Sequence, residues 1–432
     1  MASLIQPRVL KGFRDILPEN EIERSGLMEK ITKVYRSYGF VPIDTPVLEY
    51  SEILLRKSNG ETEKQVFRFL DNGKRDVALR FDLTVPFARF TAEHESELYF
   101  PFKRYHLSKV WRGEKPQAGR YREFIQCDID TVGSDSAAAD FEILSIMRAA
   151  LAEIGVKDIT IHVNHRGIFN RFLAKLGVAE KAEDILRSVD KLAKVGKEEV
   201  KKELVEYTQS EEKADQILTY ISGSTDFDST LNMIEQMAGG EDSDSQRMRD
   251  MMKAAGIEAT YVLDPSITRG LDYYTGVVYE TFLNELPSIG SVCSGGRYDN
   301  LAGLYTKTKL SGVGASIGLD RLLAGLEQLG KTGKKGSYLD VEIYCMDKSL
   351  AVHYQGVAEK LRQKGINVEV FPEAKKMAQQ YAVTDAKTVP WGILIGTNEA
   401  EKNVLTLKKL ATREQFENLT VEQAAEKILS EK

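Results

Sequence analysis

Residues 102–132 read FKRYHLSKVWRGEKPQAGRYREFIQCDIDTV, and this stretch decides the fold. Residues 102–112 and 122–132 predict two adjacent strands, and the connection between them contains Pro116 and Gly119. Strand side chains alternate between two faces. One face of the second strand therefore carries the apolar residues Ile125, Cys127 and Ile129, and the other carries Phe124, Gln126, Asp128 and Asp130. The apolar face supplies a core, and the polar face suits a polar ligand.

The charge of this stretch also favours a ligand site. Between Lys103 and Glu123 the chain has seven Lys and Arg residues against two Glu residues. A solvated charged loop is the alternative reading. However, Arg112 and Glu114 follow one strand, and Phe124 and Gln126 lie on its partner. Fixed cations beside an aromatic ring and carboxylates are typical of a binding site for a polar molecule.

The flanking segments predict an α+β protein. A helix precedes residue 39, a hairpin is expected at residues 66–80, and a second helix covers residues 137–154. Strand patterns return at residues 260–263, 276–283 and 291–294. The glycine-rich segment 312–318 then leads into a leucine-rich helix. We expect an antiparallel sheet with flanking helices, in which these glycines allow close approach of backbone segments or leave room for a flat ligand.

Two other segments interrupt or follow this body. Residues 165–256 are rich in Lys and Glu and predict a helical insertion, and the end of the chain alternates strands with helices. The expected divisions are 1–164 and 257–330 for the two parts of the main domain, 165–256 for the insertion, 331–337 for a linker and 338–432 for a C-terminal α/β domain. We expect a largely parallel sheet in this last domain.

Composition narrows the function classes. The net charge of −6 argues against non-specific coating of nucleic acid but permits a local basic surface. The three cysteines, Cys127, Cys293 and Cys345, are far apart, so a disulfide framework or a cysteine-rich zinc site is not expected. We also expect no metal site in the protein itself, no membrane span and a cytoplasmic location.

Two glycine-containing segments resemble nucleotide-binding motifs but do not meet the structural requirements of those motifs. Residues 325–332 match a phosphate-binding loop letter for letter, but that loop must follow a strand and open a helix. Here the match lies at the end of a leucine-rich helix, so a helix end followed by a linker is the better interpretation. The glycines at 312, 314 and 318 lack the G-x-G-x-x-G spacing of a dinucleotide fold.

Three motifs together resemble the signatures of class II aminoacyl-tRNA synthetases. Residues 112–124, containing Arg112, resemble the second signature, and residues 312–321 resemble the third. Residues 39–49 resemble the first, which in that class forms the dimer interface. Residues 269–276, RGLDYYTG, resemble the signature particular to the histidyl-tRNA synthetase family, and the likeness covers essentially the whole chain.

The resemblance implies a binding site for ATP. The positions that match it are Arg112, Glu114, Phe124 and Arg321. Arg112 would bind the α-phosphate and the histidine carboxylate, because its planar fork suits both anions. Glu114 would contact the adenine, Phe124 would stack on it, and Arg321 would hold the γ-phosphate. Arg269 would lie on the α-phosphate, and Mg²⁺ is expected to accompany ATP.

The resemblance also implies a histidine site. Its positions are Asp82, Leu83, Thr84, Arg112, Gln126, Asp130, Arg269, Tyr273, Tyr274 and Tyr298. Asp82, Thr84 and Gln126 match positions that hold the α-amino group. Asp130 and the three tyrosines match the imidazole side. Neutral imidazole has one donor and one acceptor, which a carboxylate and a phenol can satisfy from opposite sides.

The expected reaction is histidine–tRNA ligation, with L-histidine, ATP and tRNA(His) as substrates and Arg112 and Arg269 as the catalytic residues. A homodimer and an anticodon-binding C-terminal domain are implied with it. Two departures from the family pattern are Asp82, where many bacterial members have Glu, and Gly113, where relatives often have a basic or polar residue.

Two rival readings belong to other function classes. One is the synthetase-like regulatory subunit of ATP phosphoribosyltransferase, a non-catalytic histidine-binding paralogue that lacks the anticodon domain. The other is a synthetase-like RNA-binding module that senses uncharged tRNA. Residues 338–432 argue against the first, and the complete set of Arg112, Arg269 and Arg321 argues against both.

Overall fold

The computed structural model describes residues 4–55, 61–117, 119–224, 226–256, 260–267, 273–333 and 335–431. Contacts divide the chain into two compact units. The first contains residues 1–14 and 27–331, and the second contains residues 15–26 and 332–432. Each unit has its own hydrophobic core.

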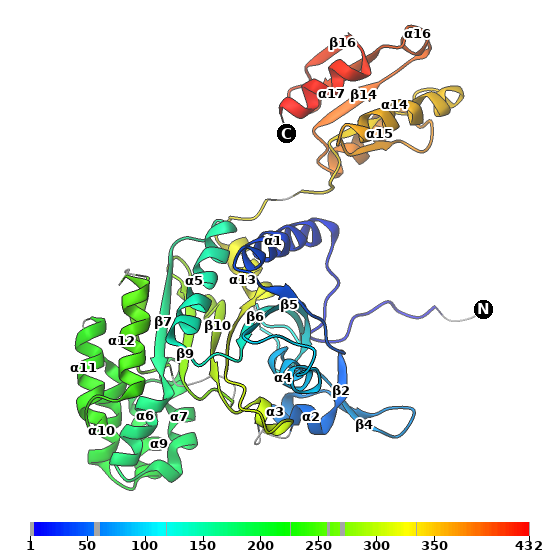
Figure 1. The fold of residues 1–432 in the computed structure, drawn as a ribbon. Coiled ribbons are helices and arrows are strands. Elements are labelled where there is room, and N and C mark those ends of the chain that lie inside the picture. Colours follow the sequence, from blue (N-terminus) through cyan, green and yellow to red (C-terminus); the bar gives the residue numbers. More distant parts are fainter. Residues whose placement is uncertain are drawn as a thin grey trace. The chain divides into compact units, whose positions relative to one another are not determined.

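The first unit is built on a large sheet, in which the described strands follow the order β1-β5-β6-β11-β10-β9-β7-β8 (Figure 1). Their bounds are β1 Val41–Pro42, β5 Phe102–Trp111, β6 Glu123–Val132, β7 Ile159–His165, β8 Tyr261–Leu263, β9 Val277–Leu283, β10 Cys293–Tyr298 and β11 Gly312–Gly318. All neighbours are antiparallel except the pairs β1–β5 and β7–β8. The antiparallel sheet expected from the sequence is confirmed.

The alternation of β6 separates the core from the polar face, as predicted. Ile125, Cys127 and Ile129 join the main core, to which β11 adds Val313 and Ile317. Helices α1 (Pro18–Ser37), α5 (Ala137–Glu153) and α13 (Leu319–Gln328) supply further apolar side chains to this core. The α13 helix contains the first half of the apparent phosphate-binding loop, so that motif is a helix end, as expected.

A second, smaller sheet has the order β2-β4-β3. Its strands are β2 Leu48–Tyr50, β3 Arg68–Leu70 and β4 Asp76–Leu79, and the neighbouring short helices are α2 Ser51–Leu55, α3 Glu61–Gln65 and α4 Thr84–Glu93. The β3–β4 pair is the hairpin predicted around residue 73. Apolar side chains from α4, β5 and β6 form a separate small core with Tyr273 and Tyr298.

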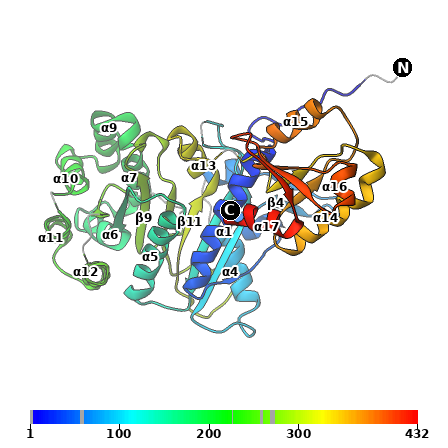
Figure 2. The ribbon, with the colours of Figure 1, turned by 90° about the horizontal axis from the view of Figure 1, so that it is seen from above.

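The described residues between β7 and β8 are helical, as predicted, and Figures 1 and 2 show α6, α7 and α9–α12 gathered beside β7 and β9. The helices are α6 Arg166–Lys175, η1 Ala179–Lys181, α7 Ala182–Asp190, α8 Leu192–Val195, α9 Lys197–Thr208, α10 Glu211–Ser222, α11 Phe227–Ala238 and α12 Ser243–Ala255. Their apolar faces belong to the main core. Two short 3₁₀ helices, η2 Pro287–Ile289 and η3 Ala302–Leu304, lie later in the first unit.

The second unit is a sheet of order β13-β12-β14-β15-β16 with helices. The elements are β12 Val341–Ile343, η4 Lys348–Leu350, α14 Ala351–Gln363, β13 Val368–Val370, α15 Met377–Ala386, β14 Trp391–Leu394, α16 Thr397–Glu401, β15 Leu405–Lys409, β16 Gln415–Leu419 and α17 Val421–Ser430. β12 is parallel to β13 and β14, but β15 and β16 are antiparallel. The expectation of a largely parallel sheet is therefore wrong for β15 and β16. β15 runs antiparallel to β14 although the short helix α16 lies between them in the chain, and β16 follows β15 directly as its antiparallel neighbour.

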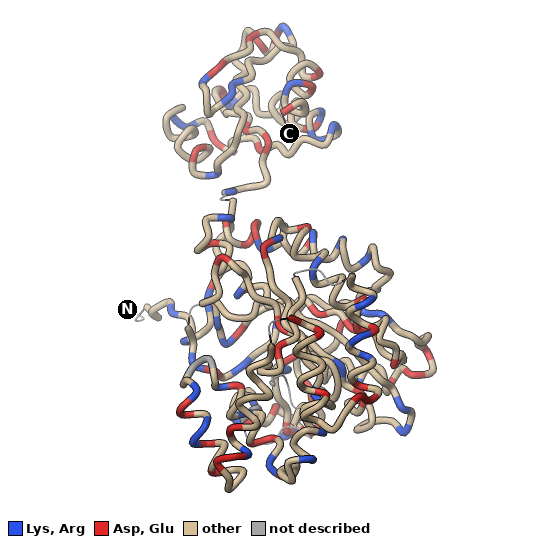
Figure 3. Tube along the Cα trace, turned by 90° about the vertical axis from the view of Figure 1, so that its left-hand side faces the viewer, with Lys and Arg blue, Asp and Glu red and all other residues tan. Residues whose placement is uncertain are grey.

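Charged residues of both signs are interspersed along both units (Figure 3). The net charge of −6 is thus not confined to one part of the chain. Among the described residues, no helix combines the length and the hydropathy needed to cross a membrane.

Candidate active site

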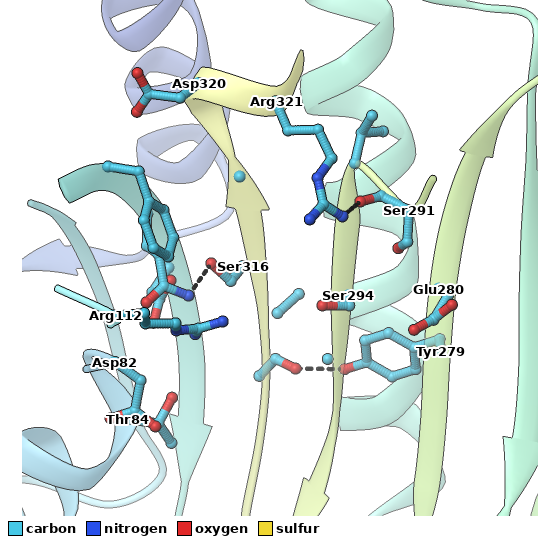
Figure 4. Close-up of a pocket in the computed structure, with 18 of the residues that line it drawn as sticks. Asp82, Thr84, Arg112, Tyr279, Glu280, Ser291, Ser294, Ser316, Asp320 and Arg321 are labelled. Atoms are coloured by element: carbon cyan, nitrogen blue, oxygen red, sulfur yellow. Dashed lines mark hydrogen bonds between the residues drawn. The ribbon is translucent and has the colours of Figure 1, made fainter. Parts of the chain in front are cut away.

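A cavity of about 300 Å³ opens on the polar face of the main sheet, between α4, the β5–β6 connection and the start of α13 (Figure 4). The predicted residues that line it are Asp82, Thr84, Arg112, Glu114, Phe124, Gln126, Asp130, Tyr273, Tyr274, Tyr298 and Arg321. Leu83 does not line it: this residue is fully buried, and its carbonyl oxygen accepts a hydrogen bond from Arg104 Nη2 at 3.2 Å. Arg269 lies outside the described residues.

Arg112 lies where β5 leaves the sheet and is held on one side. Its Nε donates to the carbonyl oxygen of Phe81 at 3.0 Å, and its guanidinium carbon is 5.1 Å from the centroid of the Phe124 ring. Its backbone N–H donates to the carbonyl oxygen of Arg122 at 2.9 Å. The guanidinium and the aromatic ring therefore lie together at the cavity wall.

The loop between β5 and β6 brings Glu114 to the same wall. Glu114 Oε2 is 3.7 Å from Arg120 Nη1, and Gln117 and Arg120 form an antiparallel bridge. Gly119 has φ +69°, a left-handed conformation that glycine adopts without steric cost. A Cβ there would also stand 3.3 Å from Cγ of Arg321, so this glycine lets the loop approach the second arginine of the site.

Arg321 reaches the cavity from the first turn of α13. Its Nη1 donates to the carbonyl oxygen of Ser291 at 2.6 Å (Figure 4). The neighbouring Asp320 turns the other way, accepting the backbone N–H of Ile125 at 2.7 Å and pairing with Arg14. Asp320 thereby fixes the start of α13 against β6, which sets the distance between Arg321 and Arg112.

The cavity floor holds carboxylates and phenols in direct contact. Tyr273 Oη donates to Asp82 Oδ2 at 3.1 Å, and Tyr298 Oη donates to Asp130 Oδ1 at 2.5 Å. Asp82 also accepts the N–H of Val85 at 3.1 Å, at the start of α4. Burial raises the pKa of Asp82 and keeps the pKa of Tyr273 and Tyr298 well above the ordinary value for tyrosine.

Gly314 is the glycine that this floor requires. It pairs with Asp130 across β11 and β6, and an added Cβ would stand 2.1 Å from Asp130 Oδ1 and 2.5 Å from the carbonyl oxygen of Ile129. The glycine-rich segment is therefore itself a strand of the sheet, and it leaves space for the carboxylate of the neighbouring strand. This outcome agrees with the expected close backbone approach.

Gly113 occupies an equally tight position. Its N–H donates to the carbonyl oxygen of Gln65 at 2.6 Å, and a Cβ would lie 3.1 Å from that oxygen. The backbone at the end of α3 thus fills the space where a larger side chain would begin.

Several functional residues were missed by sequence reasoning. Asp128, Tyr279, Glu280, Ser291, Ser294, Ser316 and Asp320 also line the cavity. Asp128 could have been found, because it shares the polar face of β6 with Gln126 and Asp130. Arg104 lies beneath the floor, fully buried, with Nη2 at 2.6 Å from Asp130 Oδ2. It was counted among the cations of its segment, but nothing in the sequence indicated that it points inward.

Fold and site together define a class II aminoacyl-tRNA synthetase: an antiparallel sheet with a guanidinium on the β5–β6 hairpin and another on the helix after β11. A family model described as histidyl-tRNA synthetase matches residues 12–322, and one described as anticodon binding domain matches residues 340–431. The chain belongs to the histidyl-tRNA synthetase family. The resemblance expected from the sequence is therefore confirmed.

Individual relatives agree along most of the chain. A histidine–tRNA ligase of Treponema denticola is 63% identical over 404 residues, which cover 91% of this chain and 90% of that protein. A histidine–tRNA ligase of Rhodopirellula baltica is 49% identical, with 95% of each chain covered. The crystal structure of histidyl-tRNA synthetase from Nostoc sp. is 31% identical, with a TM-score of 0.88 over 99% of this chain and 100% of that chain.

Proposed function

We propose that this chain is a histidine–tRNA ligase, which activates L-histidine with ATP and transfers it to tRNA(His). The observation that carries this proposal is one cavity in which Arg112, Phe124 and Arg321 stand above Asp82, Asp130 and their tyrosines. The upper part suits a nucleoside triphosphate, and the lower part suits a small molecule with polar nitrogen groups. The chain's relatives named histidine–tRNA ligase support the same assignment.

In the first step, the histidine carboxylate attacks the α-phosphorus of ATP in line and pyrophosphate leaves. Arg112 and Arg269 stabilise the negative charge that develops on the α-phosphate. The support for Arg112 is its place at the cavity wall beside Phe124. The role of Arg269 at the α-phosphate rests on the resemblance to the family. The products, histidyl-adenylate and pyrophosphate, require no nucleophile from the protein.

The rest of the ATP molecule would be held by residues of the same wall. Phe124 stacks on the adenine, Glu114 contacts its edge, and Arg321 binds the γ-phosphate. Mg²⁺ enters as part of the substrate, bridging phosphate oxygens. Among the described residues no group of three or more His, Cys, Asp or Glu side chains could hold a metal ion.

The histidine would lie on the floor. Asp82, Thr84 and Gln126 hold its α-amino group, and Gln126 is oriented for this by the hydrogen bond that its Nε2 donates to Ser316 Oγ at 2.9 Å. Tyr273, Tyr274, Tyr298 and Asp130 surround the imidazole. Leu83 contributes through its carbonyl oxygen, which binds Arg104 beneath the floor.

In the second step, the terminal ribose hydroxyl of tRNA(His) attacks the adenylate carbonyl and AMP leaves. We assign residues 1–164 and 257–330 to the catalytic domain, residues 165–256 to the helical insertion, residues 331–337 to the linker and residues 338–432 to anticodon binding. The anticodon assignment rests on the family match to residues 340–431. We expect the protein to act in the cytoplasm.

A homodimer is part of the proposal, and the small sheet supports it. Its strands and the residue before β2 expose large apolar side chains, whose exposed fractions are 41% for Val47, 51% for Tyr50, 47% for Phe69 and 67% for Leu70. Exposed apolar side chains on one small sheet are a feature of surfaces that bind a protein partner. Val47 lies within the segment that resembles the dimer signature of the class.

The non-catalytic paralogue is not favoured. Relatives named histidine–tRNA ligase cover at least 90% of this chain, including its C-terminal domain. The uncharged-tRNA sensor is weakened by the intact arrangement of Arg112 and Arg321 in the cavity.

The test is histidine-dependent exchange of radioactive pyrophosphate into ATP, followed by charging of a tRNA(His) transcript. We expect exchange with histidine and none with other amino acids. The variant Arg269→Ala should lose adenylate formation and keep the wild-type melting temperature. Folded wild-type protein without exchange would refute the proposed function.

A further inference from the structure

The N-terminal segment packs against the connection between β5 and β6. Residues 10–13 form a turn, in which the N–H of Phe13 donates to the carbonyl oxygen of Leu10 at 2.9 Å. Arg122, the residue before β6, donates to this turn twice: its backbone N–H to the carbonyl oxygen of Gly12 at 2.8 Å, and its Nη1 to that of Lys11 at 3.3 Å. The turn is therefore hydrogen-bonded to a segment that lies 111 residues away in the chain.

Gly12 allows the turn to approach the connection this closely. Its φ of +88° is a left-handed conformation that residues with a side chain rarely adopt. An added Cβ would stand 2.7 Å from Cδ of Arg122 and 2.9 Å from Cγ of Pro116, so a larger residue would push the turn away. Arg122 also donates from its Nε to the carbonyl oxygen of Glu114 at 3.1 Å. The turn thus supports the connection that carries Glu114.

Arg14 follows the turn and contacts two residues of the cavity wall. Its guanidinium carbon is 3.8 Å from the centroid of the Tyr121 ring, and its Nη2 pairs with Oδ1 of Asp320. Tyr121 and Asp320 both line the cavity, whereas Arg14 does not. A guanidinium over an aromatic ring and an ion pair are both attractive contacts, and here a single side chain makes both. Arg14 therefore joins the β5–β6 connection to the start of α13.

Asp320 connects Arg14 to the part of the wall that holds Arg321. Asp320 is the second residue of α13, and its Oδ2 accepts the N–H of Ile125 at 2.7 Å. Figure 4 shows its side chain pointing away from that of Arg321 at the same end of the helix. The contacts of Arg14 therefore link the two segments proposed to hold ATP, which are the connection with Glu114 and the start of α13 with Arg321.

We propose that Arg14 is a positioning residue for ATP, which sets the β5–β6 connection at the distance from Arg321 that the nucleotide requires. This inference rests on the proposed function and deepens it. In that function one ATP molecule contacts Glu114 at its adenine and Arg321 at its γ-phosphate, so both contacts form together only when the two segments are correctly spaced. The residues proposed for histidine belong to other segments, namely the start of α4, β6, β10 and residues 273–274. Loss of Arg14 should therefore weaken the binding of ATP and leave that of histidine nearly unchanged.

The first test measures the KM of each substrate in pyrophosphate exchange with the full chain. Arg14→Ala removes the contact with Tyr121 and the ion pair with Asp320, and we expect the KM for ATP to rise about 5- to 30-fold. The KM for histidine should stay within about 2-fold of wild type. The melting temperature should fall by no more than about 5 °C, because Arg14 is partly exposed and Asp320 keeps the N–H of Ile125. An unchanged KM for ATP, an equal rise for both substrates or an unfolded variant overturns the proposal.

Two further variants separate the position of the guanidinium from its charge. Arg14→Lys keeps a positive charge beside Asp320 but loses the planar group over Tyr121, so its KM for ATP should lie between wild type and Arg14→Ala. Gly12→Ala leaves Arg14 in place and displaces the turn from the connection, so it should also raise the KM for ATP and not that for histidine. A Gly12→Ala enzyme with the wild-type KM for ATP would contradict the proposal.

A double-mutant cycle shows whether Arg14 acts through Tyr121 or contacts ATP directly. If Arg14 acts through Tyr121, the enzyme carrying both Arg14→Ala and Tyr121→Leu should have a KM for ATP within about 2-fold of the worse single variant. If the two increases multiply instead, the two residues act independently and the positioning role is refuted.

Controls separate the proposal from general damage. Arg8 is an exposed arginine of the same N-terminal segment, and Arg8→Ala should leave both KM values unchanged. A rise in Arg8→Ala equal to that in Arg14→Ala would assign the effect to the charge of the segment and overturn the proposal. Absence of histidine-dependent exchange in the wild type would refute the proposed function itself, whereas normal exchange with an unaffected Arg14→Ala variant refutes only this inference.

Discussion

Asp140 on α5 is predicted to hold the helical insertion to the catalytic sheet. It is completely buried and accepts hydrogen bonds from two arginines: Arg297 on β10, whose Nε is 2.8 Å away, and Arg247 on α12, whose Nε is 2.6 Å away. Replacing Asp140 by Ala leaves the buried Arg297 without its main counter-charge. Removal of one partner from a buried ion pair costs about 3–5 kcal/mol.

The lower end of that range applies, because Arg297 keeps other partners. Its Nη1 still donates to the carbonyl oxygen of Ser134 at 3.0 Å and to Ser311 Oγ at 2.6 Å. With an unfolding entropy of about 2.1 cal/mol/K per residue, a loss of about 3 kcal/mol in a unit of roughly 300 residues lowers the melting temperature by about 5 °C. Differential scanning calorimetry of the full chain measures this shift.

Asp135 provides a matched control, because it faces the same two arginines from the surface. Its Oδ1 is 3.1 Å from Arg247 Nη1 and 3.7 Å from Arg297 Nη1, and 65% of its side chain is exposed. Asp135→Ala should change the melting temperature by less than about 1.5 °C, since exposed pairs contribute about 1 kcal/mol or less. The reasoning is refuted if Asp140→Ala melts at the temperature of Asp135→Ala or above it.

Arg112→Lys removes the planar guanidinium, so the rate of pyrophosphate exchange should fall about 100- to 1000-fold while the melting temperature stays unchanged. An exchange rate within a few-fold of wild type would show that Arg112 does not bind the α-phosphate. Gly314→Ala forces the new Cβ against Asp130. We expect loss of histidine-dependent exchange and a destabilisation of about 1–3 kcal/mol, measured by guanidinium titration. An unfolding midpoint equal to that of wild type would contradict the tight fit at Gly314. Burial raises the pKa of Asp128 to about 7; the nearby Asp130 adds to this shift and Arg104 opposes it. The native state therefore keeps a proton that the unfolded chain releases near pH 4. As a result, the unfolding free energy falls as pH rises between about 4 and 7. Asp128→Asn lacks this penalty, and its melting temperature should exceed that of wild type by more at pH 8 than at pH 5; a gap that is constant over this range would show that Asp128 does not titrate there.

The part of the fold that the sequence predicted is the part governed by local periodicity. The alternation of residues 123–132 predicted which face of β6 joins the core and which face is polar. The helical period likewise identified α5 and α13, and it predicted that the insertion between β7 and β8 is helical. The antiparallel arrangement of β15 and β16 was not predicted, because strand direction depends on how the chain returns and not on the pattern within a strand.

Short motifs predicted which residues form the candidate site, but not which of these residues hydrogen-bond to one another. Tyr273 and Asp82 are 191 residues apart in the chain, and no pattern specifies that one donates to the other. Leu83 belongs to a motif of the site, yet its side chain lies outside the cavity and only its carbonyl oxygen serves the floor.

By itself, the sequence determined the family, the polar face of β6 and the residue types available for binding a nucleotide and an amino acid. The three-dimensional arrangement was needed to show which side chains meet, such as the ion pair of Arg104 with Asp130 and the hydrogen bond from Tyr273 to Asp82. Two aspartates on the same face of one strand are equivalent in the sequence pattern. The register of β5 and β11 against β6 makes them different, because it places Arg104 and Gly314 beside Asp130 but His106 and Ser316 beside Asp128.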